Sequence, residues 1–295
     1  MRFASFVAAG KPAFGVVSGD GLTIADLAAA GVAPDLQAFV ALGDEGITRA
    51  RHTVASGGAP SYALADVALE APFPRPVRTI ICVGKNYRDH AAEFHGSGFD
   101  ATAGASVIPD VPIIFVKHPS SVIAPGEAIV SSNDPAHTVD YEGELTVVIG
   151  KPARHVAKAD ALAHVFGYTI INDVTSRELQ SKHKQWFVGK SIDTFCPMGP
   201  YVVTADEVGD VRALRLRTFV NGELRQDAAV ADLIFDIPTL IETLSATTTL
   251  LSGDLIATGT PAGVGIGFTP PKFLRPGDSV RIAIDKLGEL INPVV

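Results

Sequence analysis

The chain has 295 residues, of which 47% are hydrophobic and 19% charged, an ordinary composition for a globular protein with a sizeable core. Its formal net charge of −8 excludes the basic surface that a nucleic-acid-binding protein needs. Apolar runs fall short of the roughly 18 residues of a membrane-spanning helix, so we expect neither nucleic acid nor membrane as a partner.

Residues 1–70 are predicted to form a small N-terminal α/β module. Strands are expected at Arg2–Ala8 and Ala13–Val17, and the spacing of apolar residues from Leu36 to Ile47 predicts one helical stretch. Because Lys11-Pro12 interrupts the first apolar run too early for a signal peptide, we expect a cytoplasmic protein.

A proline-rich segment at 71–76 marks the start of a larger unit, residues 71–295, in which short strands dominate. Asn221-Gly222 is a strong hairpin signal. One helix is expected to start at Thr175, where Thr175 and Glu178 form a capping-box pattern, and another covers about Ile237 to Leu244. The predicted fold class is therefore α+β, mainly β. The expected strands are Thr79–Val83, Pro112–Lys117, Glu144–Ile149, Gly167–Ile171, Tyr201–Thr204, Leu214–Val220, Ser279–Ile284 and Leu290–Val294.

Acidic residues alternate just before the third of these strands. Residues two apart on a strand share a face, so Asp140, Glu142 and Glu144 would project together. Crowded carboxylates repel one another unless they are protonated, solvated or bridged by a cation. The solvent-exposed face of an amphipathic strand explains the spacing equally well, and both readings stay open on this pattern.

Asp173 follows another predicted strand and is a candidate to complete a ligand set. Together, Glu142, Glu144 and Asp173 would supply three oxygens and leave about three octahedral positions for water or substrate. This donor set favours Mg²⁺, with Mn²⁺ or Ca²⁺ as alternatives. Zinc is disfavoured because no His or Cys lies at ligand spacing nearby.

His90 and Glu93 lie three residues apart on a predicted short helix and are therefore neighbours. A carboxylate beside an imidazole raises its basicity and fixes its tautomer, although a surface ion pair is the alternative. The following segment, Phe94–Asp110, is rich in Gly and Ala and is interpreted as a lid. Lys190, in an apolar context beside Trp186, is either a partner for an anionic substrate or an ordinary surface lysine.

A glycine loop at Thr258–Gly265 offers hydroxyls and backbone N–H donors that suit a carboxylate or oxyanion. Most such loops are simple turns, and this one lacks the spacing of a dinucleotide fingerprint. Gly189-Lys190-Ser191 likewise lacks the upstream glycine of a phosphate-binding loop. The two cysteines, Cys82 and Cys196, lie in apolar stretches and are expected to be buried thiols.

Taken in order, these motifs resemble the fumarylacetoacetate hydrolase family, in its short two-module subgroup. The resemblance covers residues from about 78 to 293 and is far more specific than any single motif. It implies a mixed β-roll catalytic domain, usually a homodimer. The matching segments are Gly84 to Glu93, Glu142 to Leu145, Asn172 to Gln180, Gly189 to Ser191 and Thr258 to Gly265.

By the same resemblance, Glu142, Glu144 and Asp173 would bind Mg²⁺ or a similar ion, and Asp140 falls outside the ligand set. His90 and Glu93 become the water-activating pair, and Lys190 becomes an electrostatic partner of the reacting oxygens. The implied substrate contacts are Arg177, Gln180 and Thr260. The additional upstream aspartate of fumarylacetoacetase has no counterpart in Gly84–Tyr87, which argues against that particular activity.

The implied activity is hydrolytic cleavage of a C–C bond in a 2,4-dioxo acid such as an acylpyruvate. Decarboxylation of a 2-oxo acid such as oxaloacetate, or isomerisation of a 2-hydroxy-dienoate, is the alternative at the same metal site. A third hypothesis, a binding module with a structural ion, would not need the His90–Glu93 pair. We therefore expect an enzyme with a small 2-oxo or 2,4-dioxo acid as its partner.

Overall fold

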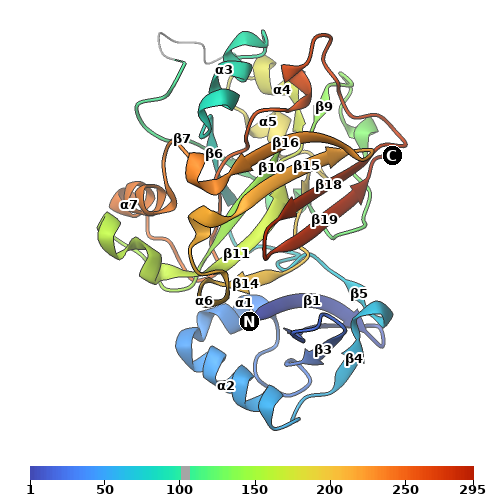
Figure 1. Cartoon of the computed structure of the whole chain (residues 1–295), viewed down its shortest axis with the longest axis vertical. Coiled ribbons are helices and arrows are strands. Elements are labelled where there is room, and N and C mark those ends of the chain that lie inside the picture. The colour runs from blue at the N-terminus through green and yellow to red at the C-terminus, as the bar shows by residue number, and fades with distance from the viewer. Residues whose placement is uncertain (101–106) are drawn as a thin grey trace.

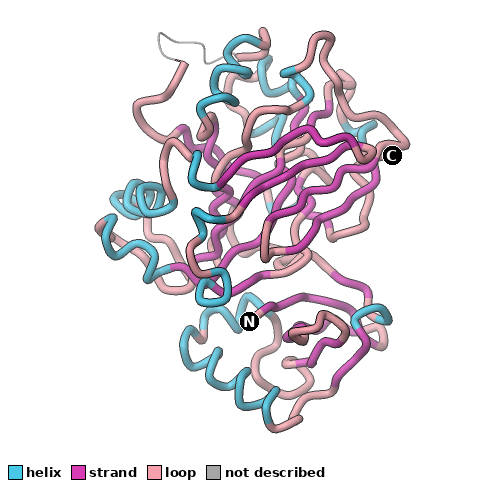
Figure 2. The backbone as a smooth tube through the Cα atoms, in the orientation of Figure 1, coloured by secondary structure: helices cyan, strands magenta, loops and turns pink. Residues whose placement is uncertain are grey.

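The computed structural model describes residues 1–100 and 107–295 (Figures 1 and 2). Its centre is an 11-stranded mixed sheet of order β4-β3-β2-β1-β14-β11-β10-β17-β6-β7, with β5 paired beside β1. These strands are β1 (Arg2–Ala8), β2 (Lys11–Val17), β3 (Thr23–Asp26), β4 (Ser61–Ala63), β5 (Ala68–Leu69), β6 (Ile80–Gly84), β7 (Ile113–Lys117), β10 (Gly143–Ile149), β11 (Val165–Asn172), β14 (Val202–Thr204) and β17 (Leu255–Ala257).

A second, antiparallel sheet of four strands covers β10 and β11 (Figure 1). Its order is β16 (Glu223–Ala229), β15 (Arg215–Val220), β18 (Ser279–Ile284) and β19 (Gly288–Pro293). The predicted hairpin is confirmed, since Asn221 and Gly222 connect β15 to β16 with φ angles of 52° and 81°. Leu145 and Val147 of β10 share one buried cluster with Leu216 and Ile282 of the smaller sheet. The main core therefore lies between the two sheets, as the mainly β prediction requires.

The N-terminal strands extend the central sheet. β1 pairs antiparallel with β14, with Arg2 opposite Val203. The helical stretch predicted here is confirmed but divided at Leu42, because the chain forms α1 (Leu36–Ala41) and α2 (Gly43–Ala55), and Gly43 at the start of α2 has a φ of 57°. Phe39 packs against Phe166 of β11 with ring centroids 6.2 Å apart. The boundary between residues 70 and 71 stays a prediction.

Of the remaining helices, α3, α4 and α5 lie at the top of the view, α7 lies at its left and α6 lies close to α1 (Figure 1). They are α3 (Arg88–Gly96), α4 (Arg177–Lys182), α5 (Phe187–Lys190), α6 (Ala205–Val208) and α7 (Ile237–Thr247). Two short ladders complete the fold, β9 (Val139–Asp140) with β12 (Thr175–Ser176) and β8 (Val122–Ile123) with β13 (Cys196–Pro197).

The capping box predicted at Thr175 and Glu178 is wrong by one residue. Ser176 is the N-cap of α4, and its hydroxyl accepts from the Leu179 backbone N–H at 3.4 Å. Thr175 belongs to β12, and its hydroxyl donates to the carbonyl oxygen of Asp173 at 2.8 Å. Strand pairing with β9 therefore delays the start of the helix.

Both cysteines are buried free thiols, as predicted. Burial raises the pKa of Cys82 well above its usual range and that of Cys196 to about 12, so neither is a ready nucleophile. Within the described residues, no helix combines the length and apolar character needed to cross a bilayer.

Candidate active site

The candidate functional side chains lie at one end of four neighbouring central strands, β11, β10, β17 and β6. β10 is antiparallel to β11 and β17, and β6 is parallel to β17, so the start of β10 meets the ends of the other three. Glu142 precedes β10, Asp173 follows β11 and Thr260 follows β17, while α3 begins shortly after β6. Residues far apart in the sequence therefore converge.

Glu142, Glu144 and Asp173 form a buried carboxylate group, with one oxygen from each lying within 4.8 Å of the others. The strand register creates it, because Gly143 pairs with Asn172 and the Asp173 N–H donates to the Glu142 carbonyl oxygen at 2.8 Å. Asp140 is not a member and lies on β9, so the alternation of one strand does not extend back to it. The solvent-exposed strand face considered from the sequence is wrong.

Two lysines contact this group. Lys190 Nζ lies 2.7 Å from Glu142 Oε2 and 2.7 Å from Asp173 Oδ2. Lys117, at the end of β7, has no exposed side-chain surface, and its Nζ lies 2.7 Å from Asp173 Oδ1. Lys117 also donates to the carbonyl oxygen of Lys190. Sequence reasoning missed Lys117, although a lysine that closes an apolar strand is a signal of a buried charge.

The pKa values of Glu142 and Glu144 are shifted in opposite directions. Burial opposes ionisation of Glu142, but Lys190 and Arg177 outweigh it and hold the pKa of Glu142 at about 2. Burial, reinforced by the negative charges of Asp173 and Glu142, raises the pKa of Glu144 well above its usual range. Three buried carboxylates that converge within 4.8 Å and offer only oxygen donors fit a hard divalent cation.

Arg177 is fully buried and is held by acidic partners on two sides. Its Nε donates to Asp140 Oδ2 at 2.9 Å, and Nη1 lies 2.7 Å from Glu142 Oε1. Nη1 also donates to Gln180 Oε1 at 3.2 Å. Asp140 further accepts from the backbone N–H groups of Gly265 and Ile266 at 2.6 and 3.1 Å. Asp140 thus connects Arg177 to the glycine loop instead of binding an ion.

His90 and Glu93 lie on α3, whose predicted position is confirmed. His90 Nδ1 is 3.2 Å from Glu93 Oε2, and both side chains are largely buried, which excludes a solvent-exposed ion pair. Glu93 Oε1 accepts from the Gly263 N–H at 2.9 Å. A Cβ on Gly267 would lie 1.7 Å from the same oxygen, so the loop leaves room for this carboxylate only because Gly267 has no side chain.

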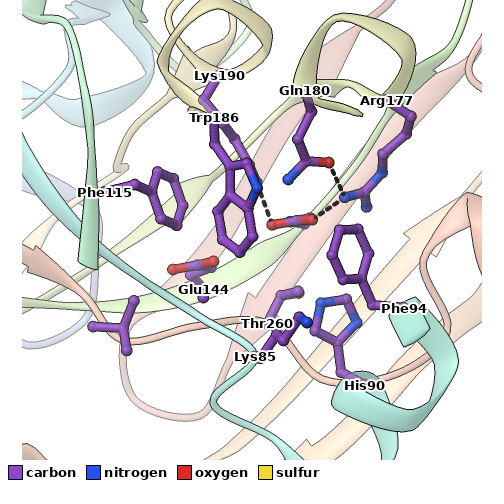
Figure 3. A pocket seen from close by; sticks show the side chains of 13 residues that line it. Lys85, His90, Phe94, Phe115, Glu144, Arg177, Gln180, Trp186, Lys190 and Thr260 are labelled. Atoms are coloured by element: carbon purple, nitrogen blue, oxygen red, sulfur yellow. Dashed lines mark hydrogen bonds and ion pairs between the residues drawn. The ribbon is translucent and has the colours of Figure 1, made fainter. Parts of the chain in front are cut away.

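These features lie around one pocket, in which His90, Arg177, Glu144 and Lys190 surround a common space (Figure 3). The profile of a family described as fumarylacetoacetate (FAA) hydrolase C-terminal matches residues 79–295 of the chain. The chain belongs to this family.

Similar proteins in the fumarylacetoacetate hydrolase family have several named activities. The chain is 50% identical over 262 residues to oxaloacetate tautomerase YisK of Bacillus subtilis strain 168, covering 86% of this chain and 84% of the relative. The structure of a fumarylacetoacetate hydrolase from Exiguobacterium antarcticum matches with a TM-score of 0.83 at 37% identity, covering 100% and 99% of the two chains.

A maleylpyruvate hydrolase from Sphingobium sp. SYK-6, solved with manganese(II) and pyruvate, matches with a TM-score of 0.78 at 36% identity. The alignment covers 100% of this chain and 99% of that one. Members of the family are thus enzymes of more than one reaction type, and a divalent metal is bound in at least one of them.

The pocket walls come mainly from aromatic and polar side chains. Trp186 lies so close to Gly84 that a Cβ there would meet its ring at 2.2 Å, and Phe94 and Phe115 pack edge-on against the same indole. Sequence reasoning missed these aromatic residues and also Lys85, which lines the pocket. Their types carry no metal or catalytic signal.

Thr260 also lines the pocket, but its hydroxyl already donates to the Gly143 carbonyl oxygen at 2.9 Å and accepts from Gln226 Nε2 at 2.7 Å. This arrangement fixes the glycine loop against β10, and a substrate contact by Thr260 stays a prediction. Of the predicted lid, Phe94–Asp110, the stretch 101–106 lies outside the described residues. Phe94 itself belongs to α3, and Phe99 packs edge-on against Phe273 with centroids 6.2 Å apart.

Proposed function

We propose that the protein is a divalent-metal-dependent enzyme that moves a proton at the carbon next to the carbonyl of a small 2-oxo acid, interconverting the keto and enol forms of an oxaloacetate-like substrate. The observation that carries this proposal is that His90, paired with Glu93, lines one pocket together with Glu142, Glu144 and Arg177. The 50% identity to an oxaloacetate tautomerase supports the choice of reaction.

Glu142, Glu144 and Asp173 would hold the ion, which we propose is Mg²⁺, with Mn²⁺ or Ca²⁺ as alternatives. When bound there, a divalent ion acts as a Lewis acid that polarises the substrate carbonyl. Lys190 lies 2.7 Å from two of these carboxylates. Its positive charge would also lie close to the reacting oxygens of the substrate.

Arg177 would bind the substrate carboxylate. Among the residues that the structure describes, its buried Nη2 has no hydrogen-bond partner, whereas its other nitrogens are held by Asp140, Glu142 and Gln180. A buried guanidinium with one unsatisfied N–H group is well suited to a carboxylate, because the new bond is charge-assisted. Gln180, on the same helix, would provide a second contact.

His90 would transfer the proton. With Nδ1–H donating to Glu93, the other ring nitrogen, Nε2, is left as an acceptor and takes a proton from C3 of the keto acid. The electron pair of the broken C–H bond moves toward the carbonyl oxygen and leaves an enolate. Return of the proton from His90 to that oxygen gives the enol and regenerates the base, and the reverse sequence returns the keto form.

Hydrolytic cleavage of a 2,4-dioxo acid such as an acylpyruvate is the second candidate. It is favoured by the full-length similarity to a maleylpyruvate hydrolase. In this reaction His90 would take a proton from water, the hydroxide would attack C4, and the C3–C4 bond would break to release the enolate of the 2-oxo acid. Both candidates stabilise the same enolate, so the same residues serve either outcome.

Product analysis separates the candidates. Purified protein with Mg²⁺ would be given enol oxaloacetate, an acylpyruvate and a 2-hydroxy-dienoate, and products would be followed by ultraviolet absorbance and NMR. We expect metal-dependent loss of the oxaloacetate enol without release of carbon dioxide. His90→Gln is the matched variant and should be inactive. Acylpyruvate cleavage alone would select the hydrolase, carbon dioxide release the decarboxylase, and no metal-dependent turnover would refute the proposal. The cytoplasmic location stays a prediction from the N-terminal sequence, and the homodimer stays a prediction from the family resemblance.

A further inference from the structure

Lys85 is a buried cation that the proposed proton transfer does not use. It follows β6, is 5% exposed, and lines the pocket together with His90 and Thr260. Figure 3 shows its side chain reaching toward His90. A buried ammonium needs a negative partner, because removing it from water is costly. The identity of that partner indicates what the residue is for.

One such partner is Asp100, from the segment that follows α3, and Asp100 Oδ2 also lies 3.6 Å from His95 Nδ1. Lys85 Nζ lies 2.6 Å from Asp100 Oδ2, and the Asp100 side chain is 1% exposed. Buried ion pairs of this kind add little net stability compared with a well-packed apolar pair, so their presence beside a pocket calls for another explanation. A carboxylate held on a pocket lysine resembles a bound anion.

Lys85 and Arg177 flank the same aromatic ring. Lys85 Nζ lies 5.3 Å from the centroid of Phe94, and Arg177 Cζ lies 5.9 Å from it. In Figure 3, Arg177 and Lys85 lie at opposite ends of the space beside the Phe94 and His90 side chains. The pocket therefore carries two cationic positions, Arg177 on one side and Lys85 beside His90 on the other, and such a pair suits a short molecule with a carboxylate at each end.

We propose that Lys85 binds the distal carboxylate of a dicarboxylic 2-oxo acid, and that Asp100 is an internal carboxylate which this substrate group displaces. The inference rests on the proposed function and names its substrate class. A monocarboxylic 2-oxo acid would use Arg177 alone and leave the Lys85–Asp100 pair intact. Lys85 is thus the residue that distinguishes dicarboxylic from monocarboxylic substrates.

Binding is measured on the full chain with Mg²⁺ present, using the fluorescence of Trp186, the single tryptophan, which lines the pocket. The two ligands are pyruvate and freshly dissolved oxaloacetate. We expect the wild-type protein to bind oxaloacetate at least tenfold more tightly than pyruvate. Lys85→Met should abolish that preference with pyruvate affinity unchanged, whereas Lys85→Arg should retain it. Asp100→Asn removes the competing charge and should strengthen oxaloacetate binding several-fold.

Lys272→Met is the matched control, because Lys272 also lies over a phenylalanine ring, at 4.5 Å from the centroid of Phe268, but does not line the pocket. It should bind both ligands like the wild type. An unchanged preference in Lys85→Met, or equal weakening of both ligands in Lys85→Met and Asp100→Asn, would overturn the inference while leaving the proposed function intact. Failure of the wild-type protein to bind either ligand with Mg²⁺ would overturn the proposed function, and this inference with it.

Discussion

The backbone N–H of Asp173 donates to the carbonyl oxygen of Glu142 across 2.8 Å, so two carboxylates distant in sequence project from paired backbone. Glu144 joins them from the same strand pair, since it lies opposite Ile171. Backbone pairing, rather than side-chain contacts alone, therefore fixes the spacing of the carboxylate group. The strand register makes the site rigid before any ion is bound.

Glu144→Gln is expected to stabilise the metal-free protein at alkaline pH. The raised pKa of Glu144 means that the folded protein keeps a proton which the unfolded chain, with its ordinary pKa of 4.5, releases. Stability is therefore full below that ordinary value and is lost as pH rises toward the raised pKa. The variant removes this penalty, so at pH 8 it should unfold at a higher temperature than the wild-type protein.

Thermal unfolding at pH 5 and pH 8, with and without Mg²⁺, checks this expectation. Mg²⁺ should raise the Tm of the wild-type protein more at pH 8, where it meets less competition from the proton, and should have little effect on Glu144→Gln. Glu178→Gln, an exposed change on α4, is the control. If Mg²⁺ raised the Tm of Glu144→Gln and Glu178→Gln equally, Glu144 would not be a ligand of the ion.

His90→Gln should reduce turnover by about 100-fold or more, the usual contribution of a general base, while Mg²⁺ still raises the Tm. The reason is that His90 contacts Glu93 and lines the pocket but is not one of the grouped carboxylates. Glu142→Ala should lose both turnover and the Mg²⁺ response. Steady-state kinetics and thermal shifts on the two variants measure this difference. Wild-type turnover in His90→Gln would rule out His90 as the base.

Gly267→Ala should reduce kcat by roughly tenfold or more with little change in the Mg²⁺ response. The added methyl would meet Glu93 Oε1 at 1.7 Å, so the carboxylate that orients His90 must move. Gly96→Ala is the control, because a Cβ at this last residue of α3 meets nothing within 4 Å. Similar kinetics in the two variants would show that the orientation of Glu93 is unimportant.

Asp140→Asn should lower the free energy of unfolding by about 3–5 kcal/mol, because it leaves the buried Arg177 without one of its two acidic partners. The KM should also rise, since Arg177 would lose its orientation. Urea denaturation and kinetics measure the two effects. Asp44→Asn breaks only the exposed pair with Lys151 and should change stability by less than about 1 kcal/mol. If Asp140→Asn changed neither the free energy of unfolding nor the KM, Asp140 would have no role in positioning Arg177.

Sequence patterns predicted the parts of the site that are local. Glu142 and Glu144 lie two apart, His90 and Glu93 lie three apart on a helix, and Asp173 follows a strand, so each is visible within a few residues. The hairpin at Asn221-Gly222 was predictable because φ > 0 at both positions favours these residue types.

Contacts that depend on the pairing of strands distant in sequence could not be predicted from such local patterns. Lys117 reaches Asp173, and Asp140 reaches both Arg177 and the glycine loop, only because of the strand order and register of the folded chain. The same non-local pairing places the N-cap of α4 at Ser176 instead of Thr175. Residue types alone carry no information about which strand will lie beside which.

The pairing of β1 with β14 gives the N-terminal segment a protective role. Without β1, the backbone of β14 facing it would be left unpaired at the rim of the sheet, a ready template for joining another chain edge to edge. A fragment that begins near residue 71 would keep the pocket residues, but β14 would become an exposed edge strand with unpaired backbone groups. Shortened versions of this protein are therefore expected to self-associate, and a small soluble catalytic core would need polar substitutions along β14.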